Sequence, residues 1–140
     1  MKTLSKIGLL LGAAFLLNTA PAKAQWSWPS VEDALQGAKA AVAELQMATE
    51  NLVIYDKKPE KIRADLMKRL DSAQAKLYEW APPDTIYKAG MDVYKYMRKI
   101  YDLGRKGKIS SADATMLQND SIYTFNVIMY VYDNHPYWYN

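Results

Sequence analysis

Apolar residues recur at helical spacing in four consecutive segments of the chain, and this pattern most restricts its possible fold. In the third segment, small or apolar residues follow alternating intervals of four and three positions. Such intervals place them along one seam of a helix that packs against other helices. A glycine in that seam would let a neighbouring helix approach closely. The seam consists of Ile86, Gly90, Val93, Met97 and Ile100.

Polar residues and prolines mark where these helices begin. Ser30, Asp84 and either Ser110 or Ser111 are of the kind that accept hydrogen bonds from the first free backbone N–H groups of a helix. Pro59 is typical of a first helical turn. The sequence therefore predicts helix starts at or just after each of these positions.

The apolar stripes indicate how far each helix extends. The first stripe includes Leu52 and Val53, and the second includes Trp80. Proline disfavours helix in the residue before it, so Pro82 ends the second segment. We expect helices from 31 to about 55, 59 to about 81, 85 to about 104 and 112 to about 133.

The segment from 121 to 132 is rich in β-branched and aromatic residues, which favour strands on propensity alone. No second strand-like run is present to pair with it, so we predict a helix. Its apolar residues surround nearly the whole helix. This pattern predicts a helix that is buried on several sides or that covers a partner, including a second copy of the chain.

Short connections make consecutive helices antiparallel neighbours. We therefore predict an all-α fold, an antiparallel up-down four-helix bundle that forms one domain over residues 25–140. With no cysteine in the chain, its stability must come from the packed core alone.

The first residues resemble an export signal. Lys2 and Lys6 precede an apolar run at 7–17, and Ala22-Lys23-Ala24 follows. A positive start, a short apolar centre and an A-x-A site are typical of a secretory signal peptide. We expect cleavage after residue 24, a periplasmic or secreted protein, and no membrane-spanning segment after cleavage, because a span needs about 20 apolar residues.

The net positive charge of the chain comes from this leader. The whole chain carries a formal charge of +3, and all three excess positive charges lie in residues 1–24. The rest is neutral but unevenly charged: −4 over 25–56, +7 over 57–108 and −3 over 109–140. This predicts either ion pairing between helices or a two-faced surface. Neutrality argues against a nucleic-acid partner, since such binding needs a large basic excess.

The residues needed for common catalytic or metal sites are missing. His135 is the only histidine, which excludes multi-histidine zinc sites. Residues 102–113 have the length of a calcium-binding loop, but Gly104 and Lys106 stand where oxygen ligands are needed. We predict no enzyme activity, no metal and no cofactor.

The layout of a leader, about 110 further residues, four helices and a histidine near the C-terminus resembles the periplasmic b-type cytochromes of four-helix-bundle fold. In that family a methionine near the start of the first helix and a histidine near the end of the fourth ligate haem. His135 lies near the second position, but the first methionine after the leader is Met47, well inside the first helix. The resemblance therefore implies the fold, and the missing ligand argues against haem.

Tyrosines repeat every seven residues along the third helix, at Tyr87, Tyr94 and Tyr101, beside basic residues that include Arg98. Tyrosine and arginine are enriched at protein interfaces, so this face is a candidate docking surface. The alternative is an ordinary stripe at the boundary of the core, whose hydroxyl groups reach water.

A second group of aromatic residues lies near the two ends of the domain, which an antiparallel bundle brings to the same end. Contact between the two sets would form either a hydrophobic plug or a shallow site for a sugar, a peptide or lipid headgroups. The residues are Trp26, Trp28, Tyr137, Trp138 and Tyr139.

These features predict an exported, non-enzymatic protein-binding module: an inhibitor, an immunity factor or an accessory part of an envelope or secretion assembly. Its partner would be another envelope or secreted protein. The alternative is a carrier that holds a small apolar or aromatic ligand between the helices.

Overall fold

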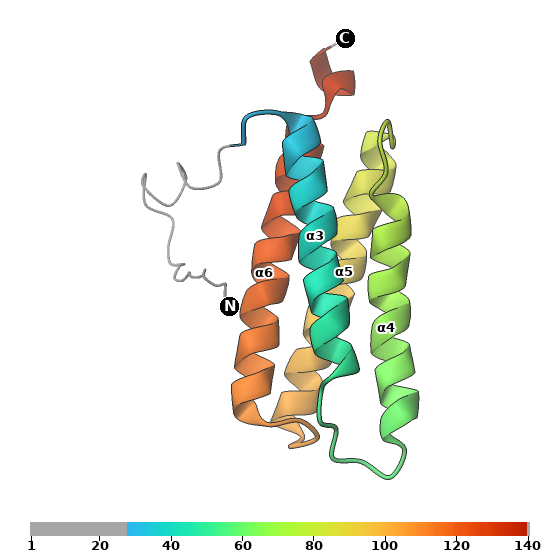
Figure 1. Ribbon diagram of the computed structural model, residues 1–140, viewed down its shortest axis with the longest axis vertical. Helices are drawn as coiled ribbons and strands as arrows, with labels where there is room; N and C mark the ends of the chain where they lie inside the picture. Colours follow the sequence, from blue (N-terminus) through green and yellow to red (C-terminus); the bar gives the residue numbers. More distant parts are fainter. Residues whose placement is uncertain (1–27, 140) are drawn as a thin grey trace.

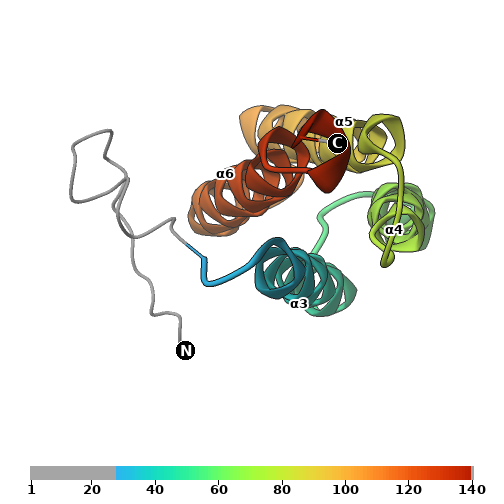
Figure 2. The same ribbon diagram turned by 90° about the horizontal axis from the view of Figure 1, so that it is seen from above.

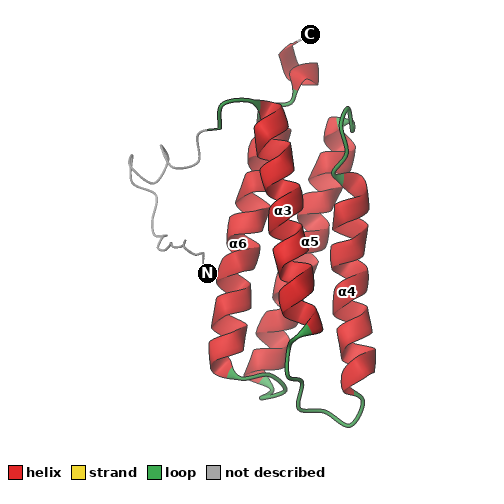
Figure 3. Ribbon diagram, viewed as in Figure 1, coloured by secondary structure: helices red, strands yellow, loops and turns green. Residues whose placement is uncertain are grey.

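The computed structural model describes residues 28–139, and most of these lie in four long helices. Consecutive helices run in opposite directions along one long axis (Figure 1). No strand occurs in the described part of the chain (Figure 3). The predicted all-α antiparallel four-helix bundle is confirmed, whereas the predicted signal peptide lies outside the described residues. The helices are α3 (Val31–Glu50), α4 (Pro59–Lys76), α5 (Pro83–Arg105) and α6 (Ser111–Asp133), followed by a short 3-10 helix, η1 (Pro136–Tyr139).

Seen along the bundle axis, the four helices stand at the corners of a quadrilateral (Figure 2). α3 packs mainly on α4 and α6, and α5 packs mainly on the same two helices. Consequently α4 and α5 form one side of the bundle, and α3 and α6 form the opposite side.

Most of the predicted helix starts are confirmed. The side-chain oxygens of Ser30 and Ser110 each accept a hydrogen bond of 3.0 Å, from the backbone N–H groups of Asp33 and Asp113 respectively. Pro59 begins α4 as expected. The prediction of Asp84 as a cap is wrong, because α5 already begins at Pro83, the residue before it.

The first helix ends earlier than predicted, at Glu50. The guanidinium of Arg63 in α4 donates hydrogen bonds to the backbone oxygens of Thr49 (2.7 Å) and Leu52 (2.8 Å), so it satisfies carbonyl groups at and just beyond the helix end. Leu52 is buried although it lies in the loop after the helix, and Val53 is exposed. The loop is held by a bond of 2.7 Å from the N–H of Tyr55 to the carbonyl of Lys108.

The second apolar stripe also ends sooner than predicted. α4 stops at Lys76, and Trp80 lies in the α4–α5 loop with 72% of its surface exposed. Its backbone is left-handed, with φ of 68°, a conformation that no helix residue adopts. Trp80 is therefore not a core residue.

The core is continuous between the four helices and is dominated by aliphatic side chains. Its largest member, Tyr96, is fully buried. The predicted close approach at Gly90 is confirmed, since an added Cβ there would collide with the end of Met129 on α6. Other fully buried core residues are Leu45, Leu66, Leu70, Ile86, Val93, Ile100, Leu117 and Ile128.

The predicted helix at 121–132 is confirmed as part of α6. Val127 and Ile128 are buried, Phe125 is half-buried against the core, and Ile122 and Tyr123 are exposed. Within residues 28–139, no helix is both long and apolar enough to cross a membrane.

Candidate functional site

The tyrosine stripe of α5 lies along its seam with α6. The ring of Tyr87 is 5.5 Å from that of Tyr132, and the ring of Tyr94 is 6.4 Å from that of Phe125, measured between centroids. Tyr87 and Tyr94 still expose 44% and 37% of their surface. Each therefore packs one side of its ring on α6 and presents the other side to solvent.

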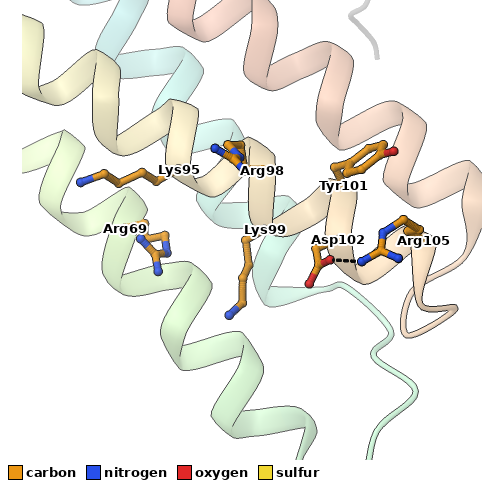
Figure 4. Close-up of a pocket in the computed structure, with 7 residues that line it drawn as sticks. All are labelled: Arg69, Lys95, Arg98, Lys99, Tyr101, Asp102 and Arg105. Atoms are coloured by element: carbon orange, nitrogen blue, oxygen red, sulfur yellow. Dashed lines mark hydrogen bonds and ion pairs between the residues drawn. The ribbon is translucent and has the colours of Figure 1, made fainter.

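Tyr101 is the most exposed member of the stripe, at 57%. It contributes to a groove between α4 and α5 with a volume of about 530 Å³ (Figure 4). An adjoining hollow of about 350 Å³ shares Arg69 and Lys99 with it. We call the two hollows together the α4–α5 groove; the first is lined by Arg69, Lys95, Arg98, Lys99, Tyr101, Asp102 and Arg105.

Two carboxylates in the groove neutralise some of its positive charge. Asp102 accepts from Arg105 at 2.8 Å and pairs with Lys106 at 3.0 Å. These side-chain bonds, with that of Lys106 the larger cause, hold the pKa of Asp102 below its ordinary value. Asp65 pairs with Lys99 at 3.2 Å and more distantly with Arg69, at 3.9 Å.

Other cations of the groove are left without such partners. In the described part of the chain, neither Lys95 nor Arg98 has a carboxylate within ion-pair distance. The guanidinium of Arg98 lies 6.0 Å from the centroid of the Tyr94 ring, at the outer limit of a cation–π contact. The Nε of Arg69 is buried and has no hydrogen-bond partner. The groove thus offers donors for negative charge beside an exposed tyrosine.

The opposite side of the bundle is acidic. α3 carries four acidic residues and one basic residue, and α6 carries three acidic residues and no basic one. Among the described residues, none of these acids forms an ion pair. Desolvation by the surrounding protein, and then the nearby Glu44, raise the pKa of Asp120 to about 6. Both arrangements predicted from charge occur: α3 and α6 form an acidic side, while Lys76–Asp92 (2.6 Å) and Lys99–Asp65 (3.2 Å) pair α4 with α5.

The structure describes part of the aromatic cluster that was predicted at the ends of the domain. The start of α3 and the end of α6 do lie at the same end of the bundle (Figure 1). Trp28 is half-buried and packs against Gly37, where an added Cβ would collide with its ring. Tyr137 is 57% exposed. Trp26 and the side chains of Trp138 and Tyr139 lie outside the described residues.

His135 has a structural role that the sequence did not reveal. Its ring is buried and its Nε2 lies 2.6 Å from the carbonyl oxygen of Ala81, in the α4–α5 loop. Its Nδ1 accepts a hydrogen bond of 3.1 Å from the N–H of Tyr137. Because a carbonyl only accepts and an N–H only donates, the ring is the neutral form with the proton on Nε2. His135 therefore connects the C-terminal segment to the α4–α5 loop.

Sequence reasoning placed Tyr101 beside Arg98 and Lys95 but missed Arg69, Lys99 and Arg105 as members of the same site. The positive charge of residues 57–108 was the available signal. It could not show which side chains of the neighbouring α4 and α5 would meet, with Arg69 between Lys95 and Lys99 (Figure 4).

Within residues 28–139, no group of three or more histidine, aspartate or glutamate side chains could hold a metal ion. Comparison of the chain with models of protein families, with curated proteins and with solved structures finds no match.

Proposed function

We propose that this protein is an exported, non-enzymatic module that binds another protein of the envelope or the exterior, as an inhibitor, an immunity factor or an accessory component of an assembly. The observation that carries the proposal is the α4–α5 groove, whose lining includes the unpaired Lys95 and Arg98 and the exposed ring of Tyr101.

The character of the groove favours a protein over a small apolar ligand. Carriers of small apolar molecules use enclosed cavities with mostly apolar walls. The α4–α5 groove lies at the surface, and all of its lining residues except Ile62 and Tyr101 are charged. Arginine and tyrosine together are frequent among the residues that contribute most to protein–protein affinity.

Tyr101 is the expected anchor of this interface. The rings of Tyr87 and Tyr94 already pack against aromatic rings of α6. Tyr101 makes no contact with the aromatic ring of another described residue. An exposed tyrosine can bury its ring in a partner while its hydroxyl keeps a hydrogen bond.

The test is quantitative capture of partners from an envelope extract of the native host by the purified protein. Tyr101→Ala removes the proposed anchor, and Met47→Ala on α3 is the matched control, because Met47 is similarly exposed, at 65%, on the opposite side. We expect a partner whose recovery falls about tenfold or more with Tyr101→Ala, as for an interface hot spot, and stays unchanged with Met47→Ala. Recovery of no partner, or of one that both variants retain, would contradict the proposal.

Export is tested separately by N-terminal sequencing and cell fractionation. Expression of the full chain in its host should give a protein that begins at Gln25 and is found in the periplasm or the medium. A protein that keeps Met1 and stays in the cytoplasm would exclude the exported part of the proposal while leaving the binding surface to the capture experiment.

A further inference from the structure

Positive charge along the α4–α5 groove exceeds what the groove itself neutralises. Asp65 and Asp102 engage Lys99 and Arg105 at 3.2 and 2.8 Å. Lys95 and Arg98 remain unpaired within residues 28–139. An unpaired cation at a groove is a site where negative charge of a ligand is favourable.

Arg69 adds a donor from the facing helix. Its only carboxylate neighbour, Asp65, lies at 3.9 Å and is closer to Lys99. Its side chain is 34% exposed, so it can still be reached from solvent. The planar donors of arginine suit the geometry of a carboxylate.

The spacing of these cations fits a chain of separated negative charges better than one compact anion. Lys95 and Arg98 are three residues apart on α5, a rise of about 4.5 Å along the helix. Asp65 and Asp102 stand among the cations, so the positive charge is divided between separate positions and is not gathered at one point. Carboxylates spaced along a polypeptide can meet Arg69, Lys95 and Arg98 one by one.

The rest of the molecule disfavours large polyanions. Residues 28–139 carry equal numbers of basic and acidic side chains, and α3 and α6 present the acidic side. Nucleic acids need a larger basic excess. A flat lipid surface would contact only protruding groups, whereas the groove is a depression between α4 and α5. A peptide can enter the groove and cover the ring of Tyr101 at the same time.

From these observations we infer that the α4–α5 groove binds an acidic polypeptide segment, with Arg69, Lys95 and Arg98 receiving its carboxylates and Tyr101 packing against an apolar side chain next to them. The inference rests on the proposed function, since it specifies the chemistry of the partner at the same site.

The test uses two fluorescein-labelled twelve-residue peptides that alternate Glu or Gln with Leu and Tyr, and it measures binding to the full protein by fluorescence anisotropy. We expect the Glu peptide to bind at least about tenfold more tightly than the Gln peptide. Its binding should weaken as salt rises from about 0.05 to 0.3 M, because exposed charges are screened.

Charge variants identify the groove. Arg98→Glu should weaken binding of the Glu peptide about tenfold or more, because it both removes an attraction and adds a repulsion. Lys39→Glu on α3 makes the same change of charge outside the groove and should change affinity less than about twofold. Circular dichroism confirms that each variant is folded. If Arg98→Glu is not folded, Arg98→Gln is used in its place.

Several outcomes would overturn the inference. These are equal binding of the Glu and Gln peptides, equal effects of the two charge variants, or tighter binding of polyphosphate, RNA or phosphatidylglycerol vesicles than of the Glu peptide. Sedimentation that shows self-association of the free protein, lost with Arg98→Glu, would identify a second copy as the occupant instead. If the captured partner is lost with Tyr101→Ala but retained with Arg98→Glu, the proposed function stands and this inference fails.

Discussion

A pair of buried hydroxyl groups shows how single residues determine the interior of this bundle. The Thr49 hydroxyl donates to the carbonyl of Leu45 at 2.7 Å, so the hydrogen bond of 2.7 Å between Thr49 and Tyr96 must have Tyr96 as the donor. Burial raises the pKa of Tyr96 from 10.0 to about 12. Because the buried hydroxyl has a hydrogen-bond partner in Thr49, it can occupy the centre of an aliphatic core at low cost.

This direction of donation predicts unequal effects of two similar substitutions. Tyr96→Phe removes the donor but leaves Thr49 bonded to Leu45, and should lower the free energy of unfolding by about 0.5–1.5 kcal/mol. Thr49→Val leaves the buried Tyr96 hydroxyl without a partner and should lower it by about 1–3 kcal/mol. Urea denaturation of both variants tests this, and a larger loss for Tyr96→Phe would contradict the assignment.

His135 gives a second prediction at this scale. His135→Phe keeps an aromatic ring but leaves the carbonyl of Ala81 and the N–H of Tyr137 without their bonds. We expect faster hydrogen exchange at the amide of Tyr137 and a loss of about 1–3 kcal/mol in stability. Asn134→Ala, which removes a bond to the carbonyl of Tyr130, is the control for the end of α6. Unchanged exchange at Tyr137 in His135→Phe would show that the ring does not hold the C-terminal segment.

At the scale of elements, the close packing of α5 on α6 depends on glycines in α5. An added Cβ at Gly90 would meet the terminal methyl group of Met129, the flexible end of a long side chain. An added Cβ at Gly104 would lie 2.6 Å from the Cβ of Ala114, which moves only with the backbone of α6. The same substitution thus meets a yielding neighbour at one position and a rigid one at the other.

We therefore expect Gly104→Ala to be less stable than Gly90→Ala by about 1–3 kcal/mol, because only the former forces the two helices apart. Both variants gain about 1 kcal/mol of helix propensity, which cancels in the comparison. Thermal denaturation of the two proteins provides the measurement. Equal melting temperatures would mean that α6 adjusts at Ala114 as easily as Met129 does at Gly90.

At the scale of the whole molecule, charge is divided between two sides of the bundle. Ion pairs within and between helices concentrate on α4, α5 and the loops beside them. The acids of α3 and α6 repel one another instead, as at Glu44 and Asp120. Such a division gives the molecule an electrostatic field that differs between its two sides.

The acidic side predicts a pH dependence of stability. The pKa of Asp120 is raised from 3.8 to about 6 in the folded protein, so the folded state binds its proton more tightly than the unfolded state does. The stability from this group is present below about pH 4 and is lost as pH rises through about 6. Asp120→Asn should therefore be more stable than wild type at pH 7, with the difference shrinking toward pH 4.

Urea midpoints at about pH 4 and pH 7 measure this effect. Glu44→Gln removes the second cause of the shift and should also raise stability at the higher pH. Asp133→Asn removes a charge from the end of α6 and serves as the control. If wild type were the more stable protein, by a difference in free energy of unfolding that grows with pH, the predicted sign would be wrong.

The sequence alone determined the helical class, the number of helices and most of their starts, because these depend on local signals. Apolar spacing, Ser30 and Ser110 as caps, and Pro59 in a first turn act within a few residues. For the same reason, the stripe containing Tyr101 and the neighbouring Arg98 could be identified on one helix. The ends of α3 and α4 were misjudged where the deciding contact was distant in sequence, as with Arg63 at the end of α3.

Only the tertiary structure decided which side chains share a surface. It placed Arg69 of α4 beside Lys95 and Lys99 of α5, left Trp80 exposed in a loop, and buried His135 against Ala81. Each of these outcomes depends on how one helix is rotated and positioned against another. Periodicity within one helix gives the side that faces the core, but the register between helices comes from packing of the complete core.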